Sequence, residues 1–139
     1  MTVTTDPFVG TWTLNPGHSV FDPNHRPRQA TMTLESLASG RYRLLAEGVN
    51  EKGEPCAEKP QEFIPDGEAH PVDGFPGLVT VSTRPYPSTL HTEVRREDGS
   101  IAGGGTFIVS PDGRSMKAIN FGFDSQLREF KQETTWDRT

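Results

Sequence analysis

The fold is decided by the stretch Phe8-Val9-Gly10-Thr11-Trp12-Thr13-Leu14 near the start of the chain. Successive side chains of a β-strand point to opposite faces, so alternate residues of this stretch share a face. One face carries Phe8, Gly10, Trp12 and Leu14, and the other carries Val9, Thr11 and Thr13. The alternation predicts a half-buried strand with Trp12 in the core, and Asn15-Pro16-Gly17 is expected to end it.

The same period of two recurs along the rest of the chain, in short apolar runs separated by Gly, Pro, Asp and Asn. Helical periodicity is nearly absent. The further strands predicted in this way are 30–37, 42–49, 58–64, 70–72, 78–83, 89–96, 101–109, 115–123 and 130–136. As a flat sheet, so many antiparallel strands would leave exposed edges. We therefore expect an all-β fold, a closed or nearly closed antiparallel up-and-down β-barrel of about 8–10 strands.

Three segments interrupt the regular pattern. The prolines and Gly17 within residues 15–28 predict a long loop across one end of the barrel, where it could serve as a lid. Pro60 weakens the strand at 58–64, which we expect at an edge. Gly103-Gly104-Gly105 predicts a bulge or sharp coiling. A phosphate-binding loop is the alternative there, but no Lys-Ser/Thr follows.

Composition limits the classes of function. The 139 residues suit one domain, 1–139, and 14 Gly and 12 Pro against 32% hydrophobic residues indicate short elements joined by tight turns. The net charge of −5 is spread over interleaved acids and bases, so we expect no nucleic-acid partner. Cys56 is the only cysteine, which favours a reducing compartment. The sequence has no signal-like start and no long apolar run, so we expect a cytoplasmic protein with no membrane association. As to oligomeric state, we expect a monomer or a homodimer.

Residues 8–14 resemble the Gly-x-Trp opening strand of the calycins, the superfamily of lipocalins and fatty-acid-binding proteins. In that superfamily the tryptophan packs at the closed end of the barrel under a basic residue of the last strand, which implies structural roles for Trp12 and Arg138. Asp66-Gly67 followed by His70-Pro71-Val72-Asp73-Gly74 is similar to a segment of bacterial lipocalin-like domains of unassigned role. Residues 15–28 do not match the helix-turn-helix lid of fatty-acid-binding proteins, and no paired arginine-tyrosine carboxylate trap is evident, which argues against a fatty-acid ligand.

The candidate ligand-binding residues follow from the face that carries Trp12. If that face points inward, alternation places four polar side chains inside the barrel: Thr92, Asn120, Gln132 and Thr134. The aromatic residues expected at the barrel mouth are Tyr42, Phe63, Phe107 and Phe121. Buried polar groups need partners, so the interior is expected to hold ordered water or a ligand with polar atoms. The alternative is that these side chains bond one another.

Catalytic and metal-binding patterns are weak. The four histidines, His18, His25, His70 and His91, lack metal-ligand spacing, and we expect no metal and no cofactor. His25 with Asp22, or His91 with Glu93, would form an acid–base pair only if turned inward, and solvated surface pairs are the alternative. No Gly-x-Ser-x-Gly elbow indicates a serine nucleophile.

Three functions are compatible with this pattern. The first is binding of a small, partly apolar molecule in the barrel interior. The second is a cofactor-free enzyme of the isomerase, cyclase or hydratase type, and the third is a protein-interaction module that uses an edge near Pro60 or the 15–28 loop. A buried ionisable group with a perturbed pKa inside the barrel would favour catalysis, whereas neutral amides and hydroxyls would favour binding.

Overall fold

The computed structural model describes residues 6–20, 28–50, 52–57, 60–72, 75–123 and 128–139. These residues form an 11-stranded sheet in which each pair of neighbouring strands is antiparallel. The strands are β1 (Gly10–Val20), β2 (Gln29–Ser36), β3 (Tyr42–Val49), β4 (Pro55–Ala57), β5 (Gln61–Phe63), β6 (Ala69–Pro71), β7 (Leu78–Tyr86), β8 (Thr89–Arg96), β9 (Ile101–Val109), β10 (Ser115–Phe123) and β11 (Glu129–Arg138), and a short 3₁₀ turn, Ala38–Gly40, separates β2 from β3.

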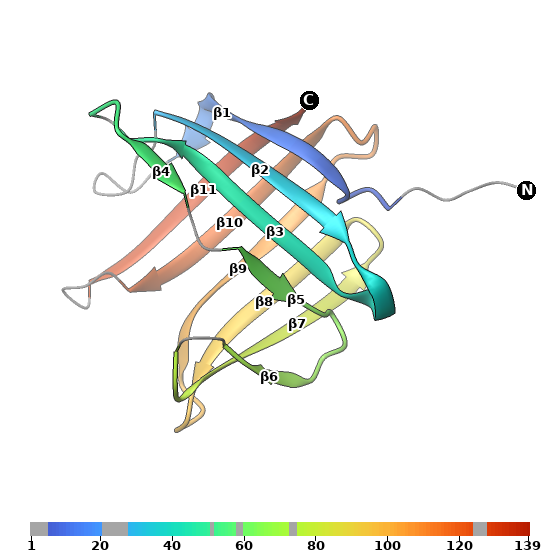
Figure 1. The fold of residues 1–139 in the computed structure, drawn as a ribbon, viewed down its shortest axis with the longest axis vertical. Coiled ribbons are helices and arrows are strands. Elements are labelled where there is room, and N and C mark those ends of the chain that lie inside the picture. Colours follow the sequence, from blue (N-terminus) through green and yellow to red (C-terminus); the bar gives the residue numbers. More distant parts are fainter. Residues whose placement is uncertain (1–5, 21–27, 51, 58–59, 73–74, 124–127) are drawn as a thin grey trace, which may run out of the picture.

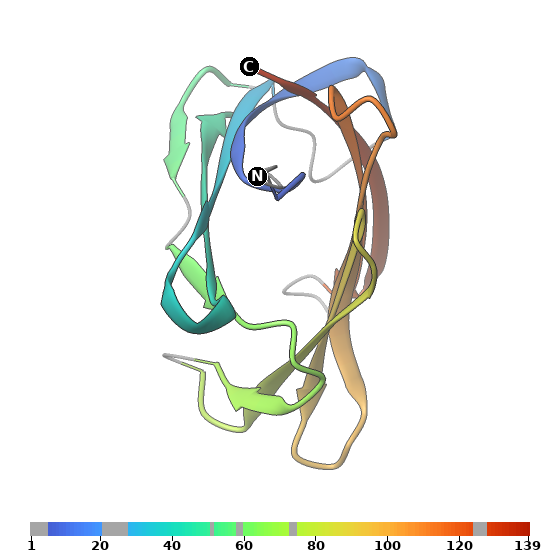
Figure 2. The ribbon, with the colours of Figure 1, turned by 90° about the vertical axis from the view of Figure 1, so that its right-hand side faces the viewer.

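The strand order is β4-β3-β2-β1-β11-β10-β9-β8-β7-β6, and β5 pairs separately with β3. The first and last strands are neighbours, with Trp12 opposite Arg138 and Leu14 opposite Trp136. The sheet curls so that β2 and β3 lie on one side of a ring and β9 and β10 on the other (Figures 1 and 2). The all-β, up-and-down antiparallel prediction is confirmed. Between described residues no ladder joins β6 to β4 or β5, so hydrogen bonding does not close the barrel completely.

Local sequence pattern predicted the central hairpin strands well. The strands expected at 42–49, 89–96, 101–109 and 115–123 have the same bounds as β3, β8, β9 and β10. The single strand expected at 58–64 was wrong, because two short strands, β4 and β5, pair with different parts of β3. Pro60 lies between them and has no N–H to continue a ladder.

The first strand runs further than predicted. Asn15-Pro16-Gly17 does not end it; β1 continues to Val20, with a shift in its register against β11 between Asn15 and Val20. Side-chain bonds replace the regular ladder there: the Thr135 N–H donates to Ser19 Oγ at 2.9 Å, and the Thr135 hydroxyl donates to the His18 carbonyl at 2.9 Å. The expected loop therefore starts later, and most of it, with Asp22 and His25, lies outside the described residues.

The glycine triplet is accompanied by the expected bulge. Val94 pairs with Gly103 but Arg95 pairs with Ile101, so β9 carries one extra residue, Ala102, against β8. An unpaired residue of this kind bends its strand and increases the local twist. The bulge therefore contributes curvature to the ring of strands.

The apolar core surrounds Trp12 at one end of the barrel. Trp12 and Phe8 are both 0% exposed, and they pack with buried side chains of β2, β8, β9 and β10: Met32, Leu34, Leu90, Val109 and Met116. The Trp12 indole N–H donates to the Phe8 carbonyl at 3.1 Å. The Arg138 guanidinium lies 4.2 Å from the centre of the Trp12 ring, in the covering position that the calycin resemblance implies.

Replacing Trp12 by Ala is expected to lower the free energy of unfolding by about 3–5 kcal/mol, because it leaves a large cavity and an unpaired Phe8 carbonyl. Chemical denaturation followed by far-UV circular dichroism measures the change. Lys117→Ala is the matched control: it removes the exposed ion pair with Glu133 and should change stability by less than about 1 kcal/mol. Equal losses in the two variants would contradict a core centred on Trp12.

Candidate functional site

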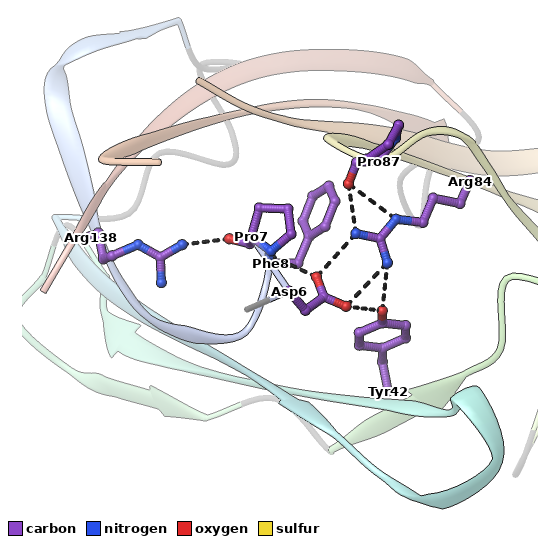
Figure 3. A network of polar contacts seen from close by, with 7 residues as sticks. All are labelled: Asp6, Pro7, Phe8, Tyr42, Arg84, Pro87 and Arg138. Atoms are coloured by element: carbon purple, nitrogen blue, oxygen red, sulfur yellow. Dashed lines mark hydrogen bonds and ion pairs between the residues drawn. The ribbon is translucent and has the colours of Figure 1, made fainter. Parts of the chain in front are cut away.

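Residues 6–9 lie within the ring of strands at the Trp12 end of the barrel, which we call the sealed end (Figures 2 and 3). Arg138 holds this segment from β11: its Nη1 donates to the Val9 carbonyl at 2.8 Å, its Nη2 donates to the Pro7 carbonyl, and its Nε donates to the Gly113 carbonyl at 2.7 Å. The last strand therefore fixes the start of the chain through main-chain acceptors as well as through Trp12.

Asp6 holds the same segment from the other side (Figure 3). Arg84 on β7 binds its carboxylate through two parallel contacts, Nη1 to Oδ2 and Nη2 to Oδ1, each at 3.1 Å. The Tyr42 hydroxyl on β3 donates to Asp6 Oδ2 and accepts from Arg84 Nη1 at 2.7 Å. The Phe8 N–H donates to Asp6 Oδ1 at 3.0 Å, and the Phe8 ring lies 5.3 Å from the Arg84 guanidinium.

The three polar side chains of this cluster control one another's protonation. Burial raises the pKa of Asp6, but hydrogen bonds from Arg84 and Tyr42 outweigh it and hold the pKa below the ordinary value of 3.8. Burial and the hydrogen bond to Asp6 raise the pKa of Tyr42 above 10.0. Burial lowers the pKa of Arg84, but the Asp6 carboxylate reverses the shift. At neutral pH the cluster therefore holds a carboxylate, a phenol and a guanidinium, each in its stable form.

Two of the expected ligand-contact residues belong to the sealed end and not to the mouth. Tyr42 is 6% exposed and its hydroxyl is committed to Asp6 and Arg84. Phe63, its neighbour on β5, stacks on the Tyr42 ring with centroids 5.5 Å apart and packs against the core. Sequence reasoning missed Asp6 and Arg84, because neither lies in a motif and they are 78 residues apart.

A row of neutral polar side chains crosses the inner face of five neighbouring strands. Ser82 pairs with Thr92, Thr92 with Gly105, Gly105 with Asn120, and Asn120 with Gln132. We call Ser82, Thr92, Asn120 and Gln132 the polar row. Gln132 is four residues from Trp136, the partner of Leu14, so the row shares the inward face of the core. Sequence alternation predicted Thr92, Asn120 and Gln132 on this face, and Ser82 is an addition.

The members of the polar row differ in their hydrogen bonds within the protein. Ser82 Oγ and Thr92 Oγ1 bond each other at 3.0 Å. The Asn120 amide is half-buried and makes no hydrogen bond within the part of the chain that the structure describes. Its oxygen lies over Gly105, where a Cβ would come within 2.4 Å of it, so only glycine leaves room for the amide. Asn120 thus presents two donors and an acceptor on the inner face of the sheet.

Apolar side chains lie on both sides of the polar row. Toward the core, the next register level contains Leu90, Phe107, Ala118 and Thr134. On the other side it contains Val94, Gly103, Gly122 and Phe130. Thr134 is satisfied by the protein, since it accepts from the Trp136 indole at 2.9 Å and lies 3.4 Å from the Ala118 carbonyl. Phe107 is on the inward face but packs, half-buried, against the core and not at the mouth where it was expected.

Phe121 is not part of this surface. It pairs with Gly104 and Lys131, one residue out of phase with Asn120, and therefore lies on the outer face of the sheet. Its ring atoms lie 3.1 and 3.2 Å from the position of a Cβ on Gly104, so the ring covers that glycine from outside. Asn120 and Phe121 are neighbours on one strand, so placing both in the interior was inconsistent with alternation.

His91 and His70 each form a pair with a carboxylate away from the inner row. His91 lies on the outer face between Thr106, 2.9 Å from Nδ1, and Glu93, 3.4 Å from Nε2. Hydrogen bonds from Arg95 and His91 lower the pKa of Glu93. His70 contacts Asp66 at 2.9 Å. The described residues include no group of three or more His, Cys, Asp or Glu side chains arranged to hold a metal ion. They also include no helix of the length and apolar character needed to cross a membrane.

Comparison with solved structures identifies the fold. The crystal structure of the wild-type fluorescent protein UnaG superposes with a TM-score of 0.64 over 98% of this chain and 100% of UnaG, at 12% identity. A redesigned β-barrel gives a TM-score of 0.56 at 13% identity, over 96% of this chain and 92% of its own. The siderocalin Ex-FABP gives 0.54 at 8% identity, over 96% and 74%. The fold is of the calycin type.

At these low identities the likeness concerns the fold alone. No protein-family model and no curated protein matches the sequence. Within the calycin-type fold, this chain combines the Trp12–Arg138 contact with a second cluster, around Asp6, at the same end of the barrel.

The Asp6 cluster predicts an acid-sensitive contribution to stability. Because the native pKa of Asp6 is depressed, its contribution is fully present above the ordinary value of 3.8 and is lost as the pH falls through the lower native pKa. Asp6→Asn should lower the free energy of unfolding by about 1–3 kcal/mol at neutral pH, since it removes charge-assisted hydrogen bonds. Urea denaturation of both proteins from about pH 7 to about pH 2 should show the two curves converging at the acid end. A difference that does not depend on pH would contradict the assignment.

Gly105→Ala tests the close approach of Asn120. The added methyl would lie 2.4 Å from Asn120 Oδ1, so the amide must turn away or the strands must separate. We expect a loss of about 1–3 kcal/mol in the free energy of unfolding. The double variant Gly105→Ala with Asn120→Ala should recover part of this loss, which a double-mutant cycle measures. Additive effects would show that the two side chains do not share the space.

Proposed function

We propose that this protein binds a small, partly apolar molecule inside the barrel and that the polar row supplies the hydrogen-bonding contacts. The observation that carries the proposal is the Asn120 amide, half-buried and without a hydrogen bond among the described residues, beside apolar levels that include Leu90, Phe107 and Phe130. An amide without a hydrogen bond to the protein, in a row with apolar side chains at the register levels on either side, is the kind of polar group that orients a ligand in a largely apolar site.

Binding is favoured over catalysis by the character of the groups. The row consists of hydroxyls and amides, which do not titrate near neutral pH. Asp6, Tyr42 and Arg84, three groups with shifted pKa values, bond one another at the sealed end. The structural neighbours support the same function, since the siderocalin Ex-FABP is described as working through dual ligand specificities.

The interaction-module alternative has less support. Large exposed apolar side chains are spread over separate elements: Val20 ends β1, Phe75 precedes β7 and Tyr86 ends β7. Two of the strands at the free edges, β4 and β6, contain a proline, Pro55 and Pro71, which has no N–H to donate to a strand of another chain. A cytoplasmic location, a place among bacterial lipocalin-like domains and a monomeric or homodimeric state stay predictions.

Native mass spectrometry of protein purified from its own host, followed by solvent extraction, is the first test. We expect a co-purifying compound at close to one per chain. Asn120→Leu and Thr92→Val should reduce its occupancy, with affinity about tenfold weaker for a lost pair of hydrogen bonds. Phe121→Leu on the outer face of the same strand is the matched control and should retain the compound. Loss of occupancy in Phe121→Leu alone would move the site to the outer surface.

A further inference from the structure

The charge of a bound ligand is constrained by what the polar row lacks. Thr92, Asn120 and Gln132 carry no charge, and neither does Ser82. A carboxylate placed against these four side chains would lose its hydration without gaining a counter-ion from the row, which is unfavourable. A neutral group with both a donor and an acceptor has no such cost, and it matches the two-sided hydrogen bonding of the Asn120 amide.

The nearest guanidinium along β7 cannot supply the missing charge. Arg84 lies two residues from Ser82, but its five N–H donors are all engaged. Nη1 donates to Asp6 and Tyr42, Nη2 donates to Asp6 and to the Pro87 carbonyl, and Nε donates to the Pro87 carbonyl at 3.1 Å. The Arg84–Tyr42 pair is built to hold a carboxylate, and Asp6 of the same chain occupies it (Figure 3).

We propose that the barrel selects neutral ligands bearing an amide-like group, and that Asp6 acts as a built-in carboxylate that keeps ligand carboxylates from the Arg84–Tyr42 pair. The inference rests on the proposed function and adds the ligand class to it. Asn120 hydrogen-bonds the amide-like group. Asp6 occupies the Arg84 guanidinium, so this group is not available to the carboxylate of an acidic ligand. Removal of the Asp6 carboxylate then frees Arg84 and Tyr42 for a carboxylate from outside.

The test uses three ligands of one shape: biphenyl, biphenyl-4-carboxamide and biphenyl-4-carboxylate. Each competes at pH 7 with the neutral fluorescent probe N-phenyl-1-naphthylamine. In the wild-type protein we expect the carboxamide to bind at least about tenfold more tightly than the carboxylate, since one unpaired buried charge outweighs one hydrogen bond. Asn120→Leu should remove the advantage of the carboxamide over biphenyl and leave biphenyl binding unchanged.

Asp6→Ala should raise the affinity for the carboxylate several-fold relative to the carboxamide. Unchanged carboxamide binding in this variant shows that it is folded. If it does not fold, the wild-type and Asn120→Leu comparisons still test whether the barrel prefers the carboxamide to the carboxylate. A carboxylate that binds wild-type protein as tightly as the carboxamide would overturn the inference but leave small-molecule binding intact. If neither the fluorescent probe nor any of the three ligands binds, the proposed function itself fails.

Discussion

The structure depends on the contact that Arg84 and Tyr42 make with Asp6. The hydrogen-bonded sheet has two free ends among the described residues, with β3 near one and β7 near the other. Tyr42 comes from β3 and Arg84 from β7, and the carboxylate between them joins the two sides of the ring through side chains. The barrel is thus held together at this end by a charge-assisted cluster in place of a strand ladder, which makes its closure sensitive to pH.

The same cluster makes the two ends of the barrel differ in the kind of polar groups they contain. At the sealed end, Trp12 and Phe8 are fully buried. Two arginines there donate hydrogen bonds to acceptors of the same chain: Arg84 to the Asp6 carboxylate and Arg138 to main-chain carbonyls. Beyond this core the inward face changes to neutral polar groups and glycines. The charges of Arg84 and Arg138 therefore hold the N-terminal segment, and the polar row next to the core offers hydrogen-bonding groups that carry no charge.

Local pattern predicted the bounds of four strands and failed where side chains replace the ladder. β3, β8, β9 and β10 were predicted with the same bounds, although β9 carries a bulge against β8. β1 passes through Pro16 and Gly17 because Ser19 and Thr135 bond across the irregularity, which no residue preference indicates. Alternation also placed Thr92, Asn120 and Gln132 together, yet it was misapplied to Phe121, which lies on the outer face of the same strand as Asn120.

The sequence by itself determined the class of fold, the inward face marked by Trp12, and the polar character of part of that face, because a period of two is a local property of an extended chain. Only the tertiary structure decided which polar groups have hydrogen-bond partners within the chain. Asp6 meets Tyr42 across 36 residues and Arg84 across 78, and such encounters leave no periodic trace. The space over Gly105 for the Asn120 amide likewise depends on cross-strand register, which pairing in the folded sheet sets.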